Sequence, residues 1–79
     1  MKNKHNITIA GVDLTLNSEN SEEYVQKLAL ELTRRINSIA LSTSGVTKLQ
    51  AAVVCALDLL DENYRLKLLI EDCLLYTSD

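Results

Sequence analysis

Apolar and polar residues alternate near the start of the chain, in the stretch ITIAGVDLTL from Ile7 to Leu16. A period of two is typical of a β-strand with one buried face, and it holds on both sides of Gly11. We therefore predict a β-hairpin of two short strands. Its apolar face should lie on a helix, because a two-stranded ribbon is barely stable alone in water. Residues 1–6 are polar, and we expect them to be frayed, with His5 at the surface.

The spacing of apolar residues then changes to three and four, which predicts an amphipathic helix over about Glu22 to Leu41. The segment before it supplies acidic residues that suit a helix N-terminus. It also supplies three candidate N-caps, which are Asn17, Ser18 and Asn20. The helical stripe itself consists of Val25, Leu28, Leu32, Ile36 and Ile39.

A second helix is predicted after the break STSGV, where Thr47 and Gln50 fit a capping box. No Pro or Gly follows, so this helix can run from about Lys48 to Leu75, a length of about 42 Å. A compact domain of this chain length is only about 30 Å across. The far end of the helix is therefore expected to project.

The long helix carries more apolar surface than the rest of the chain can cover. Its first half is apolar over a broad arc, and its second half repeats apolar residues at spacings of four and three, as in a coiled-coil seam. Soluble monomers avoid such exposed strips. One alternative is a helix folded back on its own domain, but we expect another copy, or a related chain, to cover it. The predicted interface of this dimer or tetramer consists of Val53, Leu57, Leu59, Leu60, Asn63, Leu66 and Ile70.

These elements make the predicted fold class α+β and mostly α, with an N-terminal β-hairpin, one amphipathic helix, and a long helix projecting as a coiled coil. The core should be aliphatic, because the chain contains neither Phe nor Trp while 47% of its residues are hydrophobic. Cys55 and Cys73 would lie about 27 Å apart on one helix, too far to form a disulfide within the chain. We expect a cytoplasmic protein without a membrane span, because no long apolar run is present.

Neither the net charge nor the motifs of the sequence indicate catalysis or the binding of nucleic acid, metal or cofactor. The formal net charge is −3, which argues against nucleic-acid binding as the main role. A ribbon-helix-helix repressor remains an alternative class, although the polar face of the ribbon offers Thr8, Asp13 and Thr15 instead of basic residues. Cysteine or histidine pairs with metal-ligand spacing and glycine-rich phosphate loops are absent from the sequence. We therefore predict no catalytic site, no metal and no cofactor.

The order of elements and three segments resemble the ZapA family of bacterial cell-division proteins. ITIAGVDLTL is similar to the family's opening pattern I-x-I-x-G-x-x-Y/L-x-L, and SEEYVQKLA to its E-E-Y-L-R-x-x-A. AAVVCALDLLDENYRLK resembles its A-A-V-L-A-A-L-N-I-A-D-E-L-x-K-L-K, with Asp58 where Asn is usual. The resemblance covers about Ile7 to Glu71.

This resemblance implies a non-enzymatic division factor in the cytoplasm at the mid-cell division ring. Family members dimerise through their heads, pair into tetramers through the C-terminal coiled coil, and bundle filaments of the tubulin-like protein FtsZ. A generic coiled-coil adaptor with another partner is the alternative.

Two departures from the family concern FtsZ contact. The position after the turn glycine, an arginine in some members, is Val12 here, and the loop between the helices is uncharged. We predict that Arg34, Arg35 and Lys48 supply the binding charge instead. The alternative for the two arginines is a solvated helix end, where they favour the C-terminal dipole.

The last residues, CLLYTSD, differ in character from the preceding charged helix. The nucleotide sequence TGTCTCTTATACACATCTGAC encodes them and resembles a transposon-end adapter used for sequencing libraries. We accordingly expect a head over residues 1–60, a coiled-coil segment over 61–72 that is cut short after Asp72, and a non-native tail over 73–79.

Overall fold

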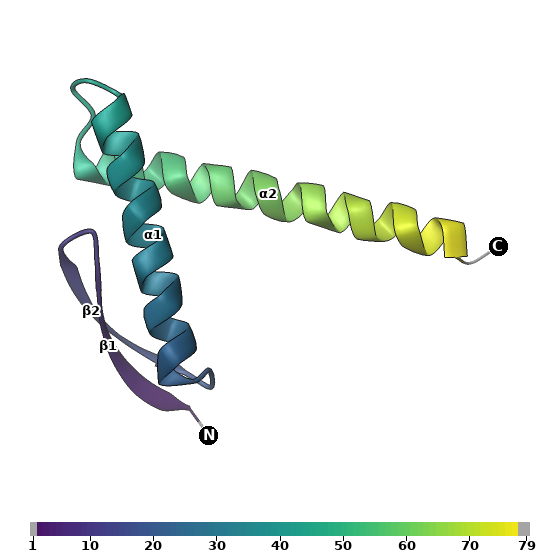
Figure 1. Cartoon of the computed structure of the whole chain (residues 1–79), viewed down its shortest axis with the longest axis horizontal. Coiled ribbons are helices and arrows are strands. Elements are labelled where there is room, and N and C mark those ends of the chain that lie inside the picture. Colours follow the sequence, from purple (N-terminus) through teal and green to yellow (C-terminus); the bar gives the residue numbers. More distant parts are fainter. Residues whose placement is uncertain (1, 78–79) are drawn as a thin grey trace.

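The computed structural model describes the backbone of residues 2–77 and the side chains of residues 2–71. Strands β1 (Asn3–Ile9) and β2 (Val12–Ser18) form a hairpin, and helices α1 (Glu22–Ser42) and α2 (Lys48–Thr77) follow. The hairpin lies along α1, while α2 crosses the C-terminal half of α1 and continues alone (Figure 1). The predicted fold class is thus confirmed in its hairpin and two helices. The tail predicted over 73–79 lies outside the described side chains.

The hairpin turns over two residues, Ala10 and Gly11, both with positive φ (51° and 83°). Two-residue loops of this kind match the right-handed twist of the strands they join. An alanine is unusual at such a φ, but here its side chain is buried, and its N–H donates a 3.0 Å hydrogen bond to Thr33 Oγ1 on α1. The turn therefore both closes the hairpin and attaches it to α1.

The hairpin begins earlier than the sequence pattern indicated. β1 starts at Asn3, so the expectation of a frayed segment through Asn6 is wrong, and so is the surface position of His5, which is buried. Cross-strand pairing explains the difference, because Asn3 to Asn6 pair with Ser18 to Thr15 along β2. Hydrogen bonds across the ribbon can thus order polar residues that no periodicity reveals.

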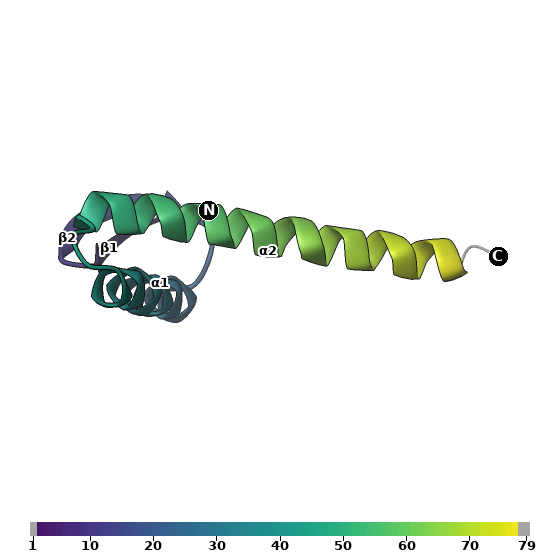
Figure 2. The same cartoon turned by 90° about the horizontal axis from the view of Figure 1, so that it is seen from above.

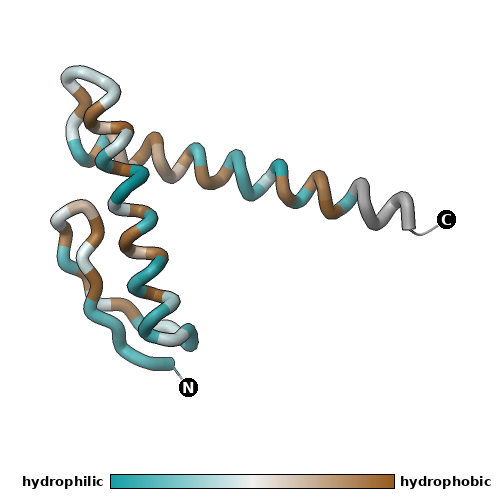
Figure 3. Tube along the Cα trace, in the orientation of Figure 1, coloured by the Kyte–Doolittle hydropathy of each residue, from teal (hydrophilic) through white to brown (hydrophobic). Residues whose placement is uncertain are grey.

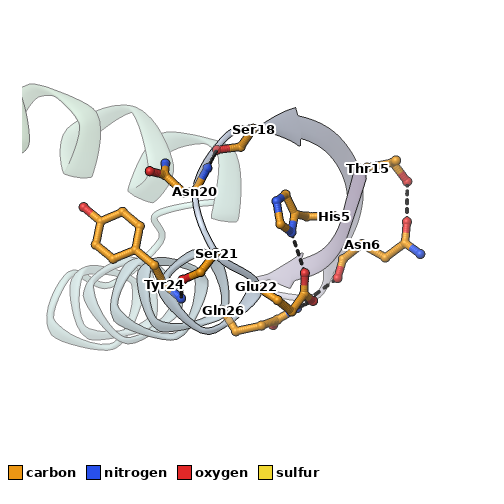
Figure 4. A network of polar contacts seen from close by, with 9 residues as sticks. All are labelled: His5, Asn6, Thr15, Ser18, Asn20, Ser21, Glu22, Tyr24 and Gln26. Atoms are coloured by element: carbon orange, nitrogen blue, oxygen red, sulfur yellow. Dashed lines mark hydrogen bonds and ion pairs between the residues drawn. The ribbon is translucent and has the colours of Figure 1, made fainter. Parts of the chain in front are cut away.

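A polar network joins the first half of β1 to the first turn of α1 (Figure 4). His5 Nδ1 contacts Glu22 Oε2, and Gln26 Nε2 donates both to Glu22 Oε1 at 3.0 Å and to the Asn6 carbonyl at 3.1 Å. The hydrogen bond from Gln26, followed by that from His5, lowers the pKa of the Glu22 carboxyl. His5 Nε2 is buried and has no hydrogen-bond partner among the described residues.

Both helices start at side-chain caps. Ser21 caps α1 by accepting from Tyr24 N at 3.2 Å, one residue after the last of the predicted candidates. The predicted capping box of α2 is confirmed, since Gln50 N donates to Thr47 Oγ1 and Thr47 N donates to Gln50 Oε1. Satisfying these otherwise unpaired N–H groups fixes where each helix begins.

The core is divided into two small clusters. Ile7, Val25 and Ala29 join β1 to α1, and a second cluster of Ala10, Ile36, Ala51 and Cys55 joins the hairpin turn, α1 and the start of α2. The hairpin and the first turns of α2 accordingly lie on the same side of α1 (Figure 2). The core ends at Cys55.

The remainder of α2 makes the molecule long and thin. The radius of gyration is 16.3 Å, against about 12 Å for a compact domain of this length. The extents of 49 × 40 × 14 Å describe an L-shaped plate two layers thick. The predicted projection of the long helix is therefore present.

Candidate functional site

The exposed surface of α2 is the main candidate for a functional surface. All seven predicted interface residues are exposed in the single chain, including the apolar side chains of Val53, Leu57, Leu60, Leu66 and Ile70. Hydrophobic residues recur along the part of α2 that extends beyond the core (Figure 3). Large exposed apolar strips mark interaction surfaces.

These side chains form two strips on neighbouring sides of α2. The proximal strip consists of Leu49, Val53, Leu57 and Leu60, and the distal strip consists of Leu59, Asn63, Leu66 and Ile70. Because consecutive helical residues are about 100° apart, Leu59 and Leu60 start from different sides of the helix. One straight neighbouring helix cannot cover both strips fully.

The hairpin adds an apolar surface that the sequence pattern did not reveal. Val12 and Leu14 pair with Ile9 and Ile7, so all four share the inner face of the ribbon. The ribbon packs on α1 mainly through β1, with Leu16 of β2 at the edge of that contact. The rest of β2 extends past α1, which leaves Val12 and Leu14 exposed by 53% and 44%. Both strands have the same alternating pattern, so no signal in the sequence distinguishes the covered strand from the overhanging one.

An apolar hollow of about 380 Å³ lies under this overhang. Its walls come from the hairpin, α1 and the first turns of α2, and Leu49 of the proximal strip lies on its rim with Lys48. The lining residues are Ile9, Ala10, Val12, Leu14, Leu32, Ile36, Lys48, Leu49 and Ala52. The proximal strip therefore continues into a concave surface of the head.

The three predicted partner-binding cations are not gathered in one patch. Lys48 lies at the hairpin turn, where a Cβ built on Gly11 would be 3.0 Å from its Nζ. Arg34 borders two hollows, one between α1 and α2 and one along the C-terminal part of α1, and Lys48 lines neither of them. Neither arginine lies in the last turn of α1, which has no basic residue, so the helix-dipole alternative loses its basis.

Arg35 is paired with carboxylates within the chain. Its Nη1 donates to Glu62 Oε2 at 2.5 Å, its Nη2 donates to Glu62 Oε1 at 3.4 Å, and its Nε lies 3.5 Å from Glu31 Oε1. The hydrogen bonds to Glu62 raise the pKa of Arg35 and lower the pKa of the Glu62 carboxyl. Arg35, Asp58 and Asp61 line one hollow between α1 and α2, so the surroundings of Arg35 are acidic.

Metal binding, nucleophilic chemistry and membrane insertion each require a recognisable set of side chains. Within residues 2–71, no three His, Cys, Asp or Glu side chains gather closely enough to hold a metal ion. Cys55 is free and buried, and burial raises the pKa of its thiol, which disfavours the reactive thiolate. Among the described helices, none combines the length and apolarity that crossing a bilayer requires.

The outer face of the hairpin bears on the ribbon-helix-helix alternative. Asp13 accepts a 2.7 Å hydrogen bond from Thr8, and Thr15 donates to Asn6 at 2.9 Å. The two threonines of this face are thus paired within it, but β1 also places Lys4 there, so the expectation of a face without basic residues is wrong. One lysine on the same face as a carboxylate still offers little charge for the phosphates of a DNA groove.

Comparison with known proteins places these features in a family. No curated protein and no solved structure gave a significant match to the chain. A family model described as cell division protein ZapA matches residues 6–73, which include most of the hairpin, all of α1 and most of α2. The match covers most of the sequence, and the chain therefore belongs to the ZapA family of cell division proteins.

Proposed function

We propose that this protein is a non-enzymatic division factor that assembles with copies of itself and cross-links or bundles FtsZ filaments at the division site. The observation that carries the proposal is the bare apolar surface of α2 in a chain of the ZapA family. Residues 1–60 act as the head and residues 61–72 as a coiled-coil segment. Its place of action is the cytoplasm at the mid-cell ring.

Two distinct apolar strips support two distinct contacts between copies. The proximal strip, together with the hollow beneath β2, suits a contact between heads, because it combines a convex row of side chains with a concave apolar surface. The distal strip repeats at coiled-coil spacing and suits a contact between rods, with Asn63 setting the register. A dimer results from one contact, and a tetramer from both.

Assembly supplies the bundling activity through avidity. A symmetric particle carries one FtsZ-binding surface per head, so it can hold two filaments at once even when each single contact is weak. Arg34 and Lys48 are the candidate contact residues, whereas Arg35 is already paired with Glu62. FtsZ binding and bundling should therefore be separable by mutation.

The test combines light scattering with FtsZ co-sedimentation. Ile70→Glu places a carboxylate in the distal strip, and we expect a smaller particle that still binds FtsZ but bundles its filaments less, because each particle carries fewer heads. Arg34→Glu, at a position outside both apolar strips and outside the hollow beneath β2, should leave the particle mass unchanged and reduce co-sedimentation. Lys4→Glu, a charge reversal on the outer face of the hairpin, is the control for a general charge effect.

Two results would count against the proposal. If the wild-type chain does not co-sediment with FtsZ at all, it is an adaptor for another partner. If Ile70→Glu leaves the particle mass unchanged, the distal strip is not an assembly surface.

A further inference from the structure

Little apolar contact holds α2 at its angle to α1. In the cluster where they cross, α2 contributes only small side chains, those of the buried Ala51 and Cys55 and the half-buried Ala52. They pack against Ile36 of α1 and Ala10 of the hairpin. Beyond Cys55, every described residue of α2 is exposed. Because a small contact near one end of a long helix resists tilting weakly, a second point of attachment further along α2 would have a large effect on its direction.

Arg35 and Glu62 form such a second point. Glu62 lies two helical turns, about 10 Å, beyond Cys55. The guanidinium of Arg35 faces it with two N–H groups, at 2.5 and 3.4 Å from the two carboxylate oxygens. Paired contacts of this kind define a direction as well as a distance, since both groups are planar.

Glu31 completes the arrangement from the α1 side. Its carboxylate lies 3.5 Å from Arg35 Nε, one helical turn before Arg35 on the same face. The guanidinium is thus held between a carboxylate of its own helix and one of α2. In the described part of the chain, this is the one ion pair that links α1 to α2, since the others join β1 to α1 or lie within a single helix.

We propose that Arg35 and Glu62 are positioning residues that brace α2 against α1 and set the angle at which the rod leaves the head. The inference rests on the proposed function in one respect: if the rods join copies, this angle sets the separation of the heads and hence the spacing of cross-linked filaments. The brace itself is a property of the single chain. It also gives Arg35 a role other than FtsZ contact.

The angle can be measured as a distance between spin labels on the full-length chain. The labels are attached to cysteines introduced at two exposed positions, Glu23 on α1 and Lys67 on α2. Cys73 is changed to Ser so that it is not labelled, and Cys55 is protected from the label because it is buried. Dilution with excess unlabelled chain restricts the signal to pairs within one chain. We expect a narrow distance distribution for the wild-type pairing, and a broader or shifted one for Arg35→Met and for Glu62→Gln.

Two further variants separate the brace from a general loss of charge. Arg35→Glu with Glu62→Arg reverses the pair, and Glu31→Gln is added so that the new carboxylate meets no like charge. This variant should restore the narrow distribution. Arg65→Met removes the 3.1 Å pair with Asp61, which lies within α2 alone, and should leave the distribution unchanged.

A wild-type distribution in Arg35→Met would overturn the brace, and so would equal broadening by Arg65→Met. Failure of the reversed pair to restore the distance would do the same. None of these outcomes depends on FtsZ, so the brace and the proposed function can fail separately. Where bundles form, electron cryo-tomography should show that filament spacings vary more with Arg35→Met than with the wild type. Equally regular spacings would show that the angle between α1 and α2 does not set the distance between filaments.

Discussion

Leu66 and Leu68 offer a direct test of whether the distal strip is an assembly surface. Both side chains are 59% exposed in the single chain, so each could bury the same area against a partner. They point to opposite sides of α2, because two residues turn about 200° around a helix. Leu66 belongs to the distal strip, and Leu68 does not. The two positions therefore form a matched pair.

The expected effect follows from the exposed area. Full burial of a leucine side chain contributes about 1.5–3 kcal/mol, so covering the exposed 59% of Leu66 contributes about 1–2 kcal/mol per copy. Leu66→Ala removes about 1 kcal/mol of this per copy, or about 2 kcal/mol where two copies meet. Since 1.4 kcal/mol is a factor of ten, the dissociation constant of the contact should rise about 30-fold.

Sedimentation equilibrium over a range of protein concentrations measures this constant directly. Leu66→Ala should move the midpoint of assembly to higher concentration, while Leu68→Ala should leave it within error of wild type. The circular dichroism of both variants reports whether the helices are intact. Equal weakening by both substitutions, or by neither, would refute the assignment of the distal strip as the contact between copies.

Three further predictions concern the head. Ile36→Ala should lower the free energy of unfolding by about 2–5 kcal/mol, because Ile36 is buried where the hairpin, α1 and α2 meet. The control Leu41→Ala, at an 88% exposed position, should change it by less than about 0.5 kcal/mol. Urea unfolding at fixed protein concentration measures both variants. Glu22→Gln removes a carboxyl whose pKa the fold lowers from 4.5. A carboxyl with a lowered pKa stabilises the folded state at pH values above 4.5, and this stabilisation is lost as the pH falls through the pKa of the folded state. At pH 7 the wild type should therefore unfold at a higher urea concentration than Glu22→Gln, and the difference between the two midpoints should shrink below pH 4.5. A difference that grows in acid would contradict the polar network around Glu22. Gly11→Ala and Gly45→Ala, at φ of 83° and 80°, should each cost about 1–2 kcal/mol in thermal unfolding, because an L side chain is strained at such a φ. The two costs should be similar, since the only atom near the new Cβ at Gly11 is the mobile Lys48 Nζ; no loss of stability in either variant would contradict the positive φ.

The local signals in the sequence predicted the elements well. Alternation on both sides of Gly11 identified the hairpin, and the pair of Thr47 and Gln50 identified the start of α2. Helical length against domain size also predicted that α2 projects. These inferences succeeded because each depends on residues close together in the chain, whose conformations are set by hydrogen bonds and side-chain spacing within a few turns.

The sequence pattern was least informative where a residue's partner is distant in the chain. His5 appeared to belong to a polar, frayed segment, yet pairing with β2 and contact with Glu22 bury it. Arg35 appeared to be a free cation, yet it pairs with Glu62, 27 positions later. Neither partner could be inferred from spacing, because the packing of β1 on α1 decides the first pairing and the crossing of α1 and α2 decides the second.

The sequence by itself determined that this chain has a hairpin, two helices and an excess of apolar helical surface. Only the tertiary structure decided where that surface lies. It placed β1 on α1 and left Val12 and Leu14 of β2 uncovered, although both strands have the same pattern. The physical reason is that periodicity reports which face of an element is apolar, whereas packing between elements decides how much of that face is covered.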